Sequence, residues 1–182
     1  MNCIKTDIEG VLIFEPDVFN DHRGYFMESF SERDLQQYIP GIRFMQDNES
    51  GSSHGILRGL HYQPGQYAQA KLVRVVQGRV LDVAVDLRKS SPDFGKHVAI
   101  ELSAENKRQL FVPKGFAHGF LVLSETAIFQ YKCDGYYAPG HEASLRYNDP
   151  TVGIDWGTGI NEAMLSEKDK NAPLLSEAIL FD

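Results

Sequence analysis

The chain has 182 residues, of which 42% are hydrophobic and 24% charged, and its formal net charge is −7. The length fits one domain, and the composition is ordinary for a globular protein. The negative charge argues against a general binder of nucleic acid or of anionic membranes. The first residues lack the apolar core of a signal peptide, and no apolar run is long enough to cross a bilayer. We expect a single domain over residues 1–182, without nucleic-acid or membrane partners, in the cytoplasm.

Cys3 and Cys133 are too few for a disulfide framework. Without an export signal, both are expected to be reduced thiols. A catalytic role for Cys133 is an alternative, because this residue lies near other candidate site residues. The sequence gives it little support, since no helix start or adjacent histidine would lower the pKa of the thiol.

The N-terminal region reads as two strands and a turn. Residues 11–14 form an apolar run, residues 20–24 are short polar residues with a glycine, and residues 25–30 alternate apolar and polar. Asn, Asp and Gly favour turns because short polar side chains bond the backbone and glycine tolerates positive φ. Residues 46–54, rich in Asn, Ser and Gly, are predicted to be a polar loop or a strand at a sheet edge.

Two short helices are predicted from capping signals. Ser31 begins the first, with apolar residues at 35, 38 and 39 on its buried side and Pro40-Gly41 at its end. Ser166 begins the second, in a Ser-x-x-Asp pattern ending at Asp169. That pattern leaves two alternatives open. Asp169 either caps the helix or orients an imidazole base.

The middle of the chain is a succession of short strands. Residues 72–76 and 80–87 flank Gln77-Gly78, a plausible hairpin turn. Further strands are predicted over 98–102, 109–112, 116–123 and 127–132. Many short strands with few helices indicate an all-β antiparallel sandwich or barrel, and a jelly roll suits this length. The order of the strands does not follow from the pattern.

Polar residues interrupt the apolar stretch over residues 55–78, namely Arg58, His61, Gln63 and Lys71. Polar side chains repeated along strands either face water or converge on a site, and we expect convergence on a site that moves protons. A metal site of the cupin type is the alternative. The ligands for such a metal are missing, because Gln63 replaces the second imidazole and the Lys71 cation lies where a carboxylate is needed. We therefore expect a site without metal.

Strand phase places three more side chains inside the barrel. Lys71 is in phase with Val73 and Val75, His118 with two phenylalanines, and Tyr131 with Phe129. Each also has a structural interpretation, as a surface lysine or as packed core residues. Arg23, Arg58 and Arg74 could bind phosphate, although surface arginines are commoner.

Several ordered motifs extend over nearly the whole chain. They are Phe19-Asn-Asp-His-Arg-Gly-Tyr-Phe-Met-Glu-Ser-Phe30, Gln46-Asp-Asn48, Leu57-Arg-Gly-Leu-His-Tyr-Gln63, Gln69-Ala-Lys-Leu-Val-Arg74, Asp82-Val-Ala-Val-Asp-Leu-Arg88, Ser103-Ala-Glu-Asn-Lys-Arg-Gln-Leu110, Gly115-Phe-Ala-His-Gly-Phe120, Tyr136-Tyr137 and Ser166-Glu-Lys-Asp169. In these motifs the sequence resembles the dTDP-4-dehydrorhamnose 3,5-epimerases. One departure is His97, where that family is expected to have an aromatic residue.

The resemblance implies a metal-free, cupin-like double-stranded β-helix (jelly roll) with a few short peripheral helices and no cofactor. It implies a homodimer in which N-terminal strands cross to the partner. The implied substrate is a dTDP-linked 4-keto-6-deoxy sugar, epimerised at C3 and C5.

The resemblance also implies a role for each matching residue. His61 is the base, Asp169 its carboxylate partner, Tyr131 the acid on the opposite face, and Lys71 the charge that stabilises the enolate. The matching contacts to the nucleotide sugar are Arg23, Glu28, Gln46, Asp47, Asn48, Arg58, Lys71, His118, Tyr137, Glu142 and Lys168. Tyr137 matches the aromatic residue that stacks on thymine.

Three other functions remain open at this point. The enzyme could act at C3 only or C5 only, on this or a related dTDP-4-keto-6-deoxy sugar. The chain could be a binding module for nucleotide sugars without activity, which the base, acid and lysine together argue against. A metal-dependent cupin oxygenase is the third alternative.

Overall fold

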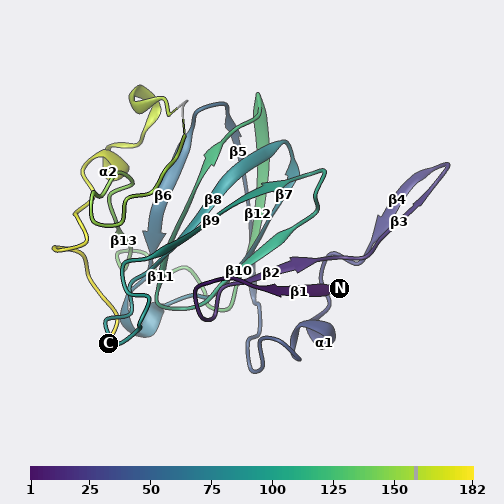
Figure 1. The fold of residues 1–182 in the computed structure, drawn as a ribbon, viewed down its shortest axis with the longest axis horizontal. Helices are drawn as coiled ribbons and strands as arrows, with labels where there is room; N and C mark the ends of the chain where they lie inside the picture. The colour runs from purple at the N-terminus through teal and green to yellow at the C-terminus, as the bar shows by residue number, and fades with distance from the viewer. Residues whose placement is uncertain (158–159) are drawn as a thin grey trace.

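The computed structural model describes residues 1–157 and 160–182, and it contains two antiparallel sheets packed face to face (Figure 1). The strands are β1 Asn2–Lys5, β2 Leu12–Glu15, β3 Val18–Asp21, β4 Gly24–Met27, β5 Gln46–Ser53, β6 Leu57–Tyr62, β7 Lys71–Gln77, β8 Arg79–Asp86, β9 His97–Ser103, β10 Gln109–Val112, β11 Phe116–Val122, β12 Thr126–Cys133 and β13 Ala143–Ser144. The helices are α1 Glu32–Leu35 and α2 Glu167–Lys170, and the 3₁₀ helices are η1 Gly65–Tyr67 and η2 Glu162–Met164.

One sheet has six strands in the order β1-β2-β10-β7-β12-β5, and the other has five in the order β13-β6-β11-β8-β9. Strands that follow one another in the chain therefore often lie in different sheets, as in a jelly roll. The predicted all-β, cupin-like fold is confirmed, and each predicted strand is present with bounds shifted by at most a few residues.

The space between the sheets is filled by the inward residues of both. Val73 and Val75 of β7 and Phe129 of β12 pack against Ala84 of β8 and Phe120 of β11. Alternation along each strand produces this layer, because successive side chains point to opposite faces of a sheet. The phase argument that placed Lys71, His118 and Tyr131 on the inward faces is therefore confirmed for the strands that carry them.

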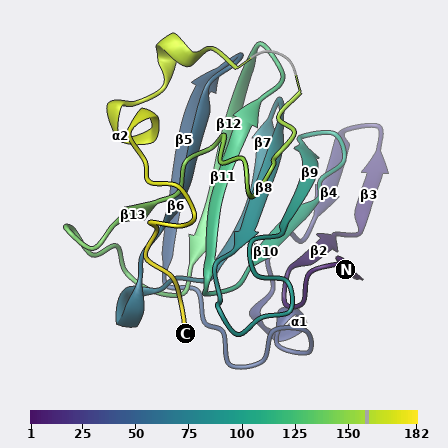
Figure 2. The ribbon, with the colours of Figure 1, turned by 60° about the vertical axis from the view of Figure 1, so that its left-hand side comes forward.

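Two further apolar layers cover the outer faces of the sheets. On the five-stranded sheet, Trp156, Leu165 and Leu175 of the C-terminal segment pack in one cluster with Leu57 and Leu60 of β6. Figure 2 shows this segment running along the side of β6 and β13 and carrying α2 beside them. The C-terminal segment is thus held in place by the barrel.

The six-stranded sheet is covered at one end by α1. Ser31 caps this helix as predicted, its Oγ accepting a hydrogen bond from the backbone N–H of Asp34. Leu35 and Ile39 are buried in one cluster with Phe14, but Tyr38 is 36% exposed. The helix is also shorter than predicted and ends at Leu35. The chain continues to Ile39 as turns, in which the backbone N–H of Ile39 donates to the carbonyl of Leu35 at 2.9 Å.

The prediction of a hairpin at Gln77-Gly78 is wrong, because β7 and β8 belong to different sheets. Gly78 has a φ of +75°, and a Cβ there would lie 2.1 Å from the carbonyl oxygen of Thr126. The chain therefore makes a close turn against the neighbouring Thr126 and crosses to the opposite sheet. Residues 46–54, predicted as a loop or an edge strand, form the edge strand β5.

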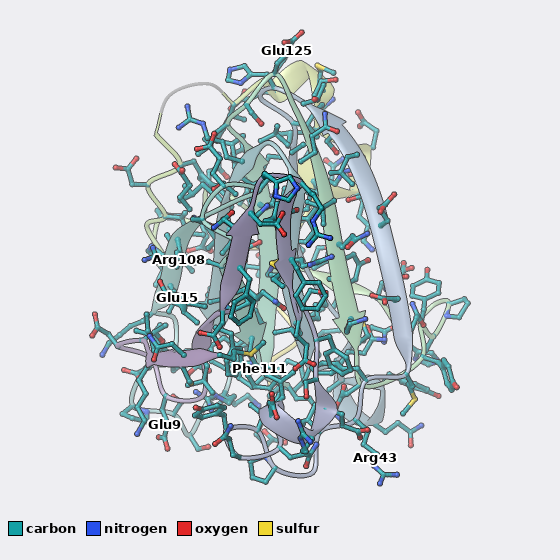
Figure 3. The ribbon with its side chains drawn as sticks, turned by 90° about the vertical axis from the view of Figure 1, so that its right-hand side faces the viewer. Glu9, Glu15, Arg43, Arg108, Phe111 and Glu125 are labelled. Atoms are coloured by element: carbon teal, nitrogen blue, oxygen red, sulfur yellow. The ribbon has the colours of Figure 1, made fainter. Side chains whose placement is uncertain are left out.

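A separate hairpin of β3 and β4 extends away from both sheets (Figure 1). Its aromatic residues are exposed, Phe19 by 65%, Tyr25 by 56% and Phe26 by 69%. Figure 3 views the molecule from the side to which the hairpin extends, and it shows Glu15 and Arg108 close together, where an ion pair of 2.9 Å joins them. Within the described residues, no helix has the length and apolar character needed to cross a membrane.

Candidate active site

A cavity of about 640 Å³ opens between the two sheets, on the side where β5 and β6 form the walls. Its lining combines residues of β5, β7 and β12 from one sheet, β6 and β11 from the other, and α2 of the C-terminal segment. Because the two walls belong to opposed sheets, a molecule inside meets side chains on both of its faces.

His61 and Asp169 form a close pair at one wall. The Nε2 atom of His61 lies 2.5 Å from Oδ1 of Asp169, which is 3% exposed. Burial raises the pKa of Asp169, but the hydrogen bond and charge of His61, together with bonds from Ser166 and the Gly59 backbone, outweigh it and lower that pKa overall. The carboxylate therefore stays ionised and holds the imidazole, and Nδ1 is the ring nitrogen left for other partners.

Both interpretations of Ser166-x-x-Asp169 apply. Ser166 is the N-cap of α2, and its Oγ accepts a hydrogen bond from the backbone N–H of Asp169. The side chain of Asp169 points to His61. Ser166 thus caps the helix, and Asp169 orients the imidazole of His61.

Tyr131 and Lys71 lie on the opposite wall. The Nζ atom of Lys71 is 5.9 Å from the ring centroid of Tyr131 and 3.5 Å from the backbone oxygen of His61. Burial raises the pKa of Tyr131 and lowers the pKa of Lys71. The phenol is consequently kept protonated. The charge of Lys71 is poorly solvated in the cavity, so an anion that enters would stabilise its ammonium form.

Cys133 lies directly across from Lys71 in the pairing of β12 with β7. Burial raises the pKa of its thiol to about 11, so the thiol is neutral near pH 7. A neutral thiol is a weak nucleophile, which removes the main support for a catalytic cysteine.

His118 lines the cavity and belongs to a second His–Asp pair. Nε2 of His118 is 3.0 Å from both carboxylate oxygens of Asp82, and Asp82 is fully buried. His118 also lies directly across from His61 in the pairing of β11 with β6. Sequence reasoning did not single out Asp82, although an acidic residue in phase with Val80 and Ala84 on an apolar strand face was a usable signal.

Polar side chains gather at the mouth of the cavity. The backbone N–H of Tyr137 donates to Oε1 of Gln46 at 2.9 Å, and the Tyr137 side chain is half exposed. Lys168 and Glu142 form an ion pair of 3.2 Å. Arg58 donates from Nε to Oγ of Ser52 at 2.8 Å. This rim offers both charges and a flat aromatic ring to a polar ligand.

The structure brings most of the predicted site residues to this one cavity. They are His61, Tyr131, Asp169, Lys71, Gln46, Asn48, Arg58, His118, Tyr137, Glu142 and Lys168. Further lining residues that the sequence did not suggest include Ser50, Ile56, Gln69, Phe120 and Phe129.

Three predicted residues do not line the cavity of their own chain. Asp47 points to the other face of β5, because it alternates with Gln46 and Asn48, and there it pairs with Lys132 at 2.5 Å. Arg23 lies at the tip of the β3–β4 hairpin with its side chain 79% exposed, and Glu28 follows that hairpin. His97 begins β9, across from Val85, and also lies outside the cavity.

Among the described residues, no group of three or more His, Cys, Asp or Glu side chains is placed to hold a metal ion. The cavity instead holds two imidazoles backed by carboxylates, a phenol and an ammonium. Fold and cavity together define a cupin-like enzyme whose side chains are arranged to move protons.

Comparison with known proteins agrees with this class. The family model described as dTDP-4-dehydrorhamnose 3,5-epimerase matches residues 5–177. The dTDP-4-dehydrorhamnose 3,5-epimerase of Shigella flexneri is 52% identical over all of this chain and 99% of the relative. The chain belongs to the dTDP-4-dehydrorhamnose 3,5-epimerase family and is an isomerase.

Solved structures support the same assignment. A dTDP-6-deoxy-D-glucose-3,5-epimerase from Legionella pneumophila, in complex with dTDP-4-keto-L-rhamnose, is 51% identical with a TM-score of 0.92. That match covers 97% of this chain and 93% of the other. A 3'-monoepimerase from Streptomyces bikiniensis, in complex with dTDP-quinovose, is 37% identical with a TM-score of 0.88, over 94% and 86% of the two chains.

Proposed function

We propose that this protein converts dTDP-4-dehydro-6-deoxy-D-glucose to dTDP-4-dehydro-L-rhamnose by inverting C3 and C5. The observation that carries the proposal is the placement of His61, held by Asp169, and Tyr131 on opposed sheets that face one cavity. Inversion without a cofactor requires a base on one face of the sugar ring and an acid on the other.

Proton removal is assigned to Nδ1 of His61, because Asp169 occupies Nε2. The C–H bond next to the C4 ketone breaks, its proton passes to Nδ1, and its electron pair moves into the carbonyl to form an enolate. Ionised Asp169 stabilises the imidazolium that results, as a carboxylate does for the histidine of a catalytic triad.

The enolate oxygen is assigned to the ammonium of Lys71. Burial lowers the pKa of Lys71 because its charge is poorly solvated, and an enolate oxygen supplies the missing counter-ion. A preorganised charge at the atom where negative charge develops stabilises the transition state more than the ground state. His118, which is backed by Asp82 and lines the same cavity, is assigned as a second donor.

Reprotonation is assigned to Tyr131. Its raised pKa keeps the hydroxyl protonated, and its position on β12 puts it across the cavity from His61 on β6. The hydroxyl gives its proton to the carbanion face opposite the one that His61 deprotonated, which inverts the carbon. Solvent then restores the proton of Tyr131 and removes that of His61.

The nucleotide is assigned to the cavity mouth. Tyr137 offers an exposed ring for stacking on thymine, and Arg58, Lys168 and the Gln46 amide lie on the same rim. Each polar residue of the rim is on β5, β6, α2 or an adjoining loop, so one extended ligand can reach several of them.

We further propose a homodimer in which the β3–β4 hairpin enters the site of the partner. Its exposed Phe19 and Phe26 would be buried by a second copy of the chain, since large exposed apolar patches usually mark interaction sites. Arg23 and Glu28 would then reach the partner's cavity, which explains why they do not line their own. The exchange involves the hairpin rather than β1 and β2, because these strands pair with their own sheet.

Reaction without a metal or cofactor also belongs to this proposal, as do a cytoplasmic location and a place in the synthesis of rhamnose-containing polysaccharide. The unpaired thiols Cys3 and Cys133 are consistent with a reducing compartment. Activity that survives dialysis against a chelator supports the metal-free reaction, and activity restored only by added metal contradicts it.

The test is incubation with dTDP-4-dehydro-6-deoxy-D-glucose in deuterated water, followed by NMR of the product. The expected result is deuterium at both C3 and C5, with none in a His61→Asn variant. Deuterium at C3 alone would instead favour an activity like that named for the Streptomyces bikiniensis relative. Binding without any exchange would favour a non-catalytic module.

A further inference from the structure

The interior of the cavity is polar on one side of Tyr131 and apolar on the other. Tyr131 and Asn48 are directly paired across β12 and β5, and Lys71 and Cys133 lie at the same end. In the opposite direction along β12, the next inward residue is Phe129. The two sides of the acid therefore present different chemistry to a bound sugar.

Phe120 and Phe129 form the apolar side as one continuous wall. Their rings are stacked, with centroids 4.2 Å apart and an angle of 15° between planes. Both line the cavity, although they are only 5% and 1% exposed. Ile56 extends the same wall.

This wall adjoins the residues assigned to the chemistry. The Phe129 ring centroid is 6.1 Å from that of Tyr131 and 6.0 Å from that of His118. Phe120 is two residues from His118 on β11, so both point to the same face of that strand. A group attached to a carbon that Tyr131 protonates therefore lies within reach of the wall.

The substrate of the proposed function has a matching asymmetry. The carbons on either side of the C4 ketone carry different substituents: C3 has a hydroxyl, and C5 has the C6 methyl. A hydroxyl buried against phenyl rings loses its hydrogen bonds to water, whereas a methyl group gains by leaving water. Only one orientation of the sugar ring places the C6 methyl against the phenyl rings and the C3 hydroxyl on the polar side.

We infer that the Phe120–Phe129 wall receives the C6 methyl and makes the enzyme selective for 6-deoxy sugars. The inference rests on the proposed function. It places C5 next to Phe129 and the C3 hydroxyl toward Asn48 and Lys71. Ser50 is a polar lining residue beside the wall, because it pairs with Phe129 across β5 and β12.

The test compares two ligands that have no ketone and differ only at C6, namely dTDP-6-deoxy-D-glucose and dTDP-D-glucose. Their dissociation constants for the wild-type protein are measured by calorimetry, with dTDP alone as the nucleotide control. We expect the 6-deoxy ligand to bind about tenfold or more tightly, because the extra hydroxyl would be buried without a partner. Equal affinities for the two sugar ligands would overturn the inference. Binding of dTDP in the same experiment would leave the proposed function standing. Loss of binding by dTDP and both sugars would overturn both.

Variants test whether the wall causes the preference for the 6-deoxy ligand. Phe120→Asn should reduce this preference several-fold, whereas Phe120→Leu, which keeps the wall apolar, should retain it. Ser50→Ala should retain it as well, and a preference that disappears in Ser50→Ala would overturn the assignment to the wall. With the keto substrate in deuterated water, Phe120→Asn should slow exchange at C5 more than at C3, and the reverse order would place the methyl elsewhere. The wild-type ligand comparison remains decisive if Phe120→Asn does not fold.

Discussion

Nε2 of His61 and Oδ1 of Asp169 are 2.5 Å apart although the residues are separated by 108 positions in the chain. His61 is fixed by the sheet, on β6, and Asp169 by a short helix that packs against it. The imidazole of His61 is therefore oriented by a segment outside the barrel.

Asp169→Asn should lower kcat by about 10²- to 10⁴-fold, because an amide neither fixes the tautomer of His61 nor stabilises its imidazolium. The amide is close in size to the carboxylate, so the fold should persist by circular dichroism. Glu167→Gln, on the exposed side of the same helix, is the matched control and should keep kcat. Equal losses in the two variants would show that the helix, rather than the carboxylate, matters.

Tyr131→Phe should impair epimerisation more than the hydrogen exchange that His61 begins. The base still removes the proton, but without the phenol it returns a solvent deuteron to the original face. The measurement is the ratio of deuterated, uninverted substrate to inverted product. Tyr136→Phe, at an exposed position, is the control. Equal loss of exchange and inversion would give Tyr131 another role.

Lys71→Met should abolish activity and yet stabilise the protein near pH 7, by about 2–4 °C in Tm if the gain is about 1 kcal/mol. The pKa of Lys71 is lower in the folded protein than in the unfolded chain, because burial disfavours the charge. Between those two pKa values the unfolded chain binds more protons, so the free energy of unfolding of the wild type rises with pH.

The advantage of Lys71→Met should accordingly shrink as the pH rises toward about 10.4, the ordinary pKa of lysine. Thermal melts at pH 7 and pH 9.5 provide the measurement. Lys89→Met, at a half-exposed position, should show no such trend. A Lys71→Met protein that is less stable than the wild type at pH 7 would contradict the view that the buried ammonium is a cost to folding.

Cys133→Ser should keep most of the activity, whereas Cys133→Asp should lose about tenfold or more. The neutral thiol leaves the facing Lys71 ammonium free for the enolate, but a carboxylate there would pair with it. Steady-state kinetics of both variants provide the measurement. Inactivation by the serine substitution would return the catalytic thiol to consideration.

Two inactive variants should restore each other if the hairpin crosses to the partner. Arg23→Ala damages the partner's site and His61→Asn damages its own, so a mixed dimer has one site with both residues intact. Random mixing should recover about a quarter of the wild-type activity, because half of the dimers are mixed and each has one good site. A mixture that stays inactive after subunit exchange would place Arg23 elsewhere.

Much of the barrel could be predicted because strand period and burial coincide. The inward phase of Lys71 and Tyr131 followed from neighbouring apolar residues. The same rule puts Asp47 on the opposite face of β5 from Gln46 and Asn48, since one step along a strand reverses the face. A match to a family motif assigns adjacent residues to the same site, whereas in a strand adjacent side chains point to opposite faces.

Other features depended on contacts far apart in sequence. The turn at Gln77-Gly78 looks local, but its direction is set by the approach of Gly78 to Thr126. The pairing of His118 with Asp82 requires knowing that β11 and β8 are neighbours. The position of Arg23 outside its own cavity depends on how the hairpin leaves the sheets.

The C-terminal segment also sets an order of completion during synthesis. The ribosome finishes every strand of both sheets before it reaches Asp169. The barrel that holds His61 can therefore form before Asp169 is available to pair with it. A chain released early would leave Leu57 and Leu60 without the covering Trp156, Leu165 and Leu175. Exposed apolar surface is bound by chaperones and attacked by proteases. The segment that brings Asp169 to His61 therefore also covers a surface that would mark the chain as unfinished.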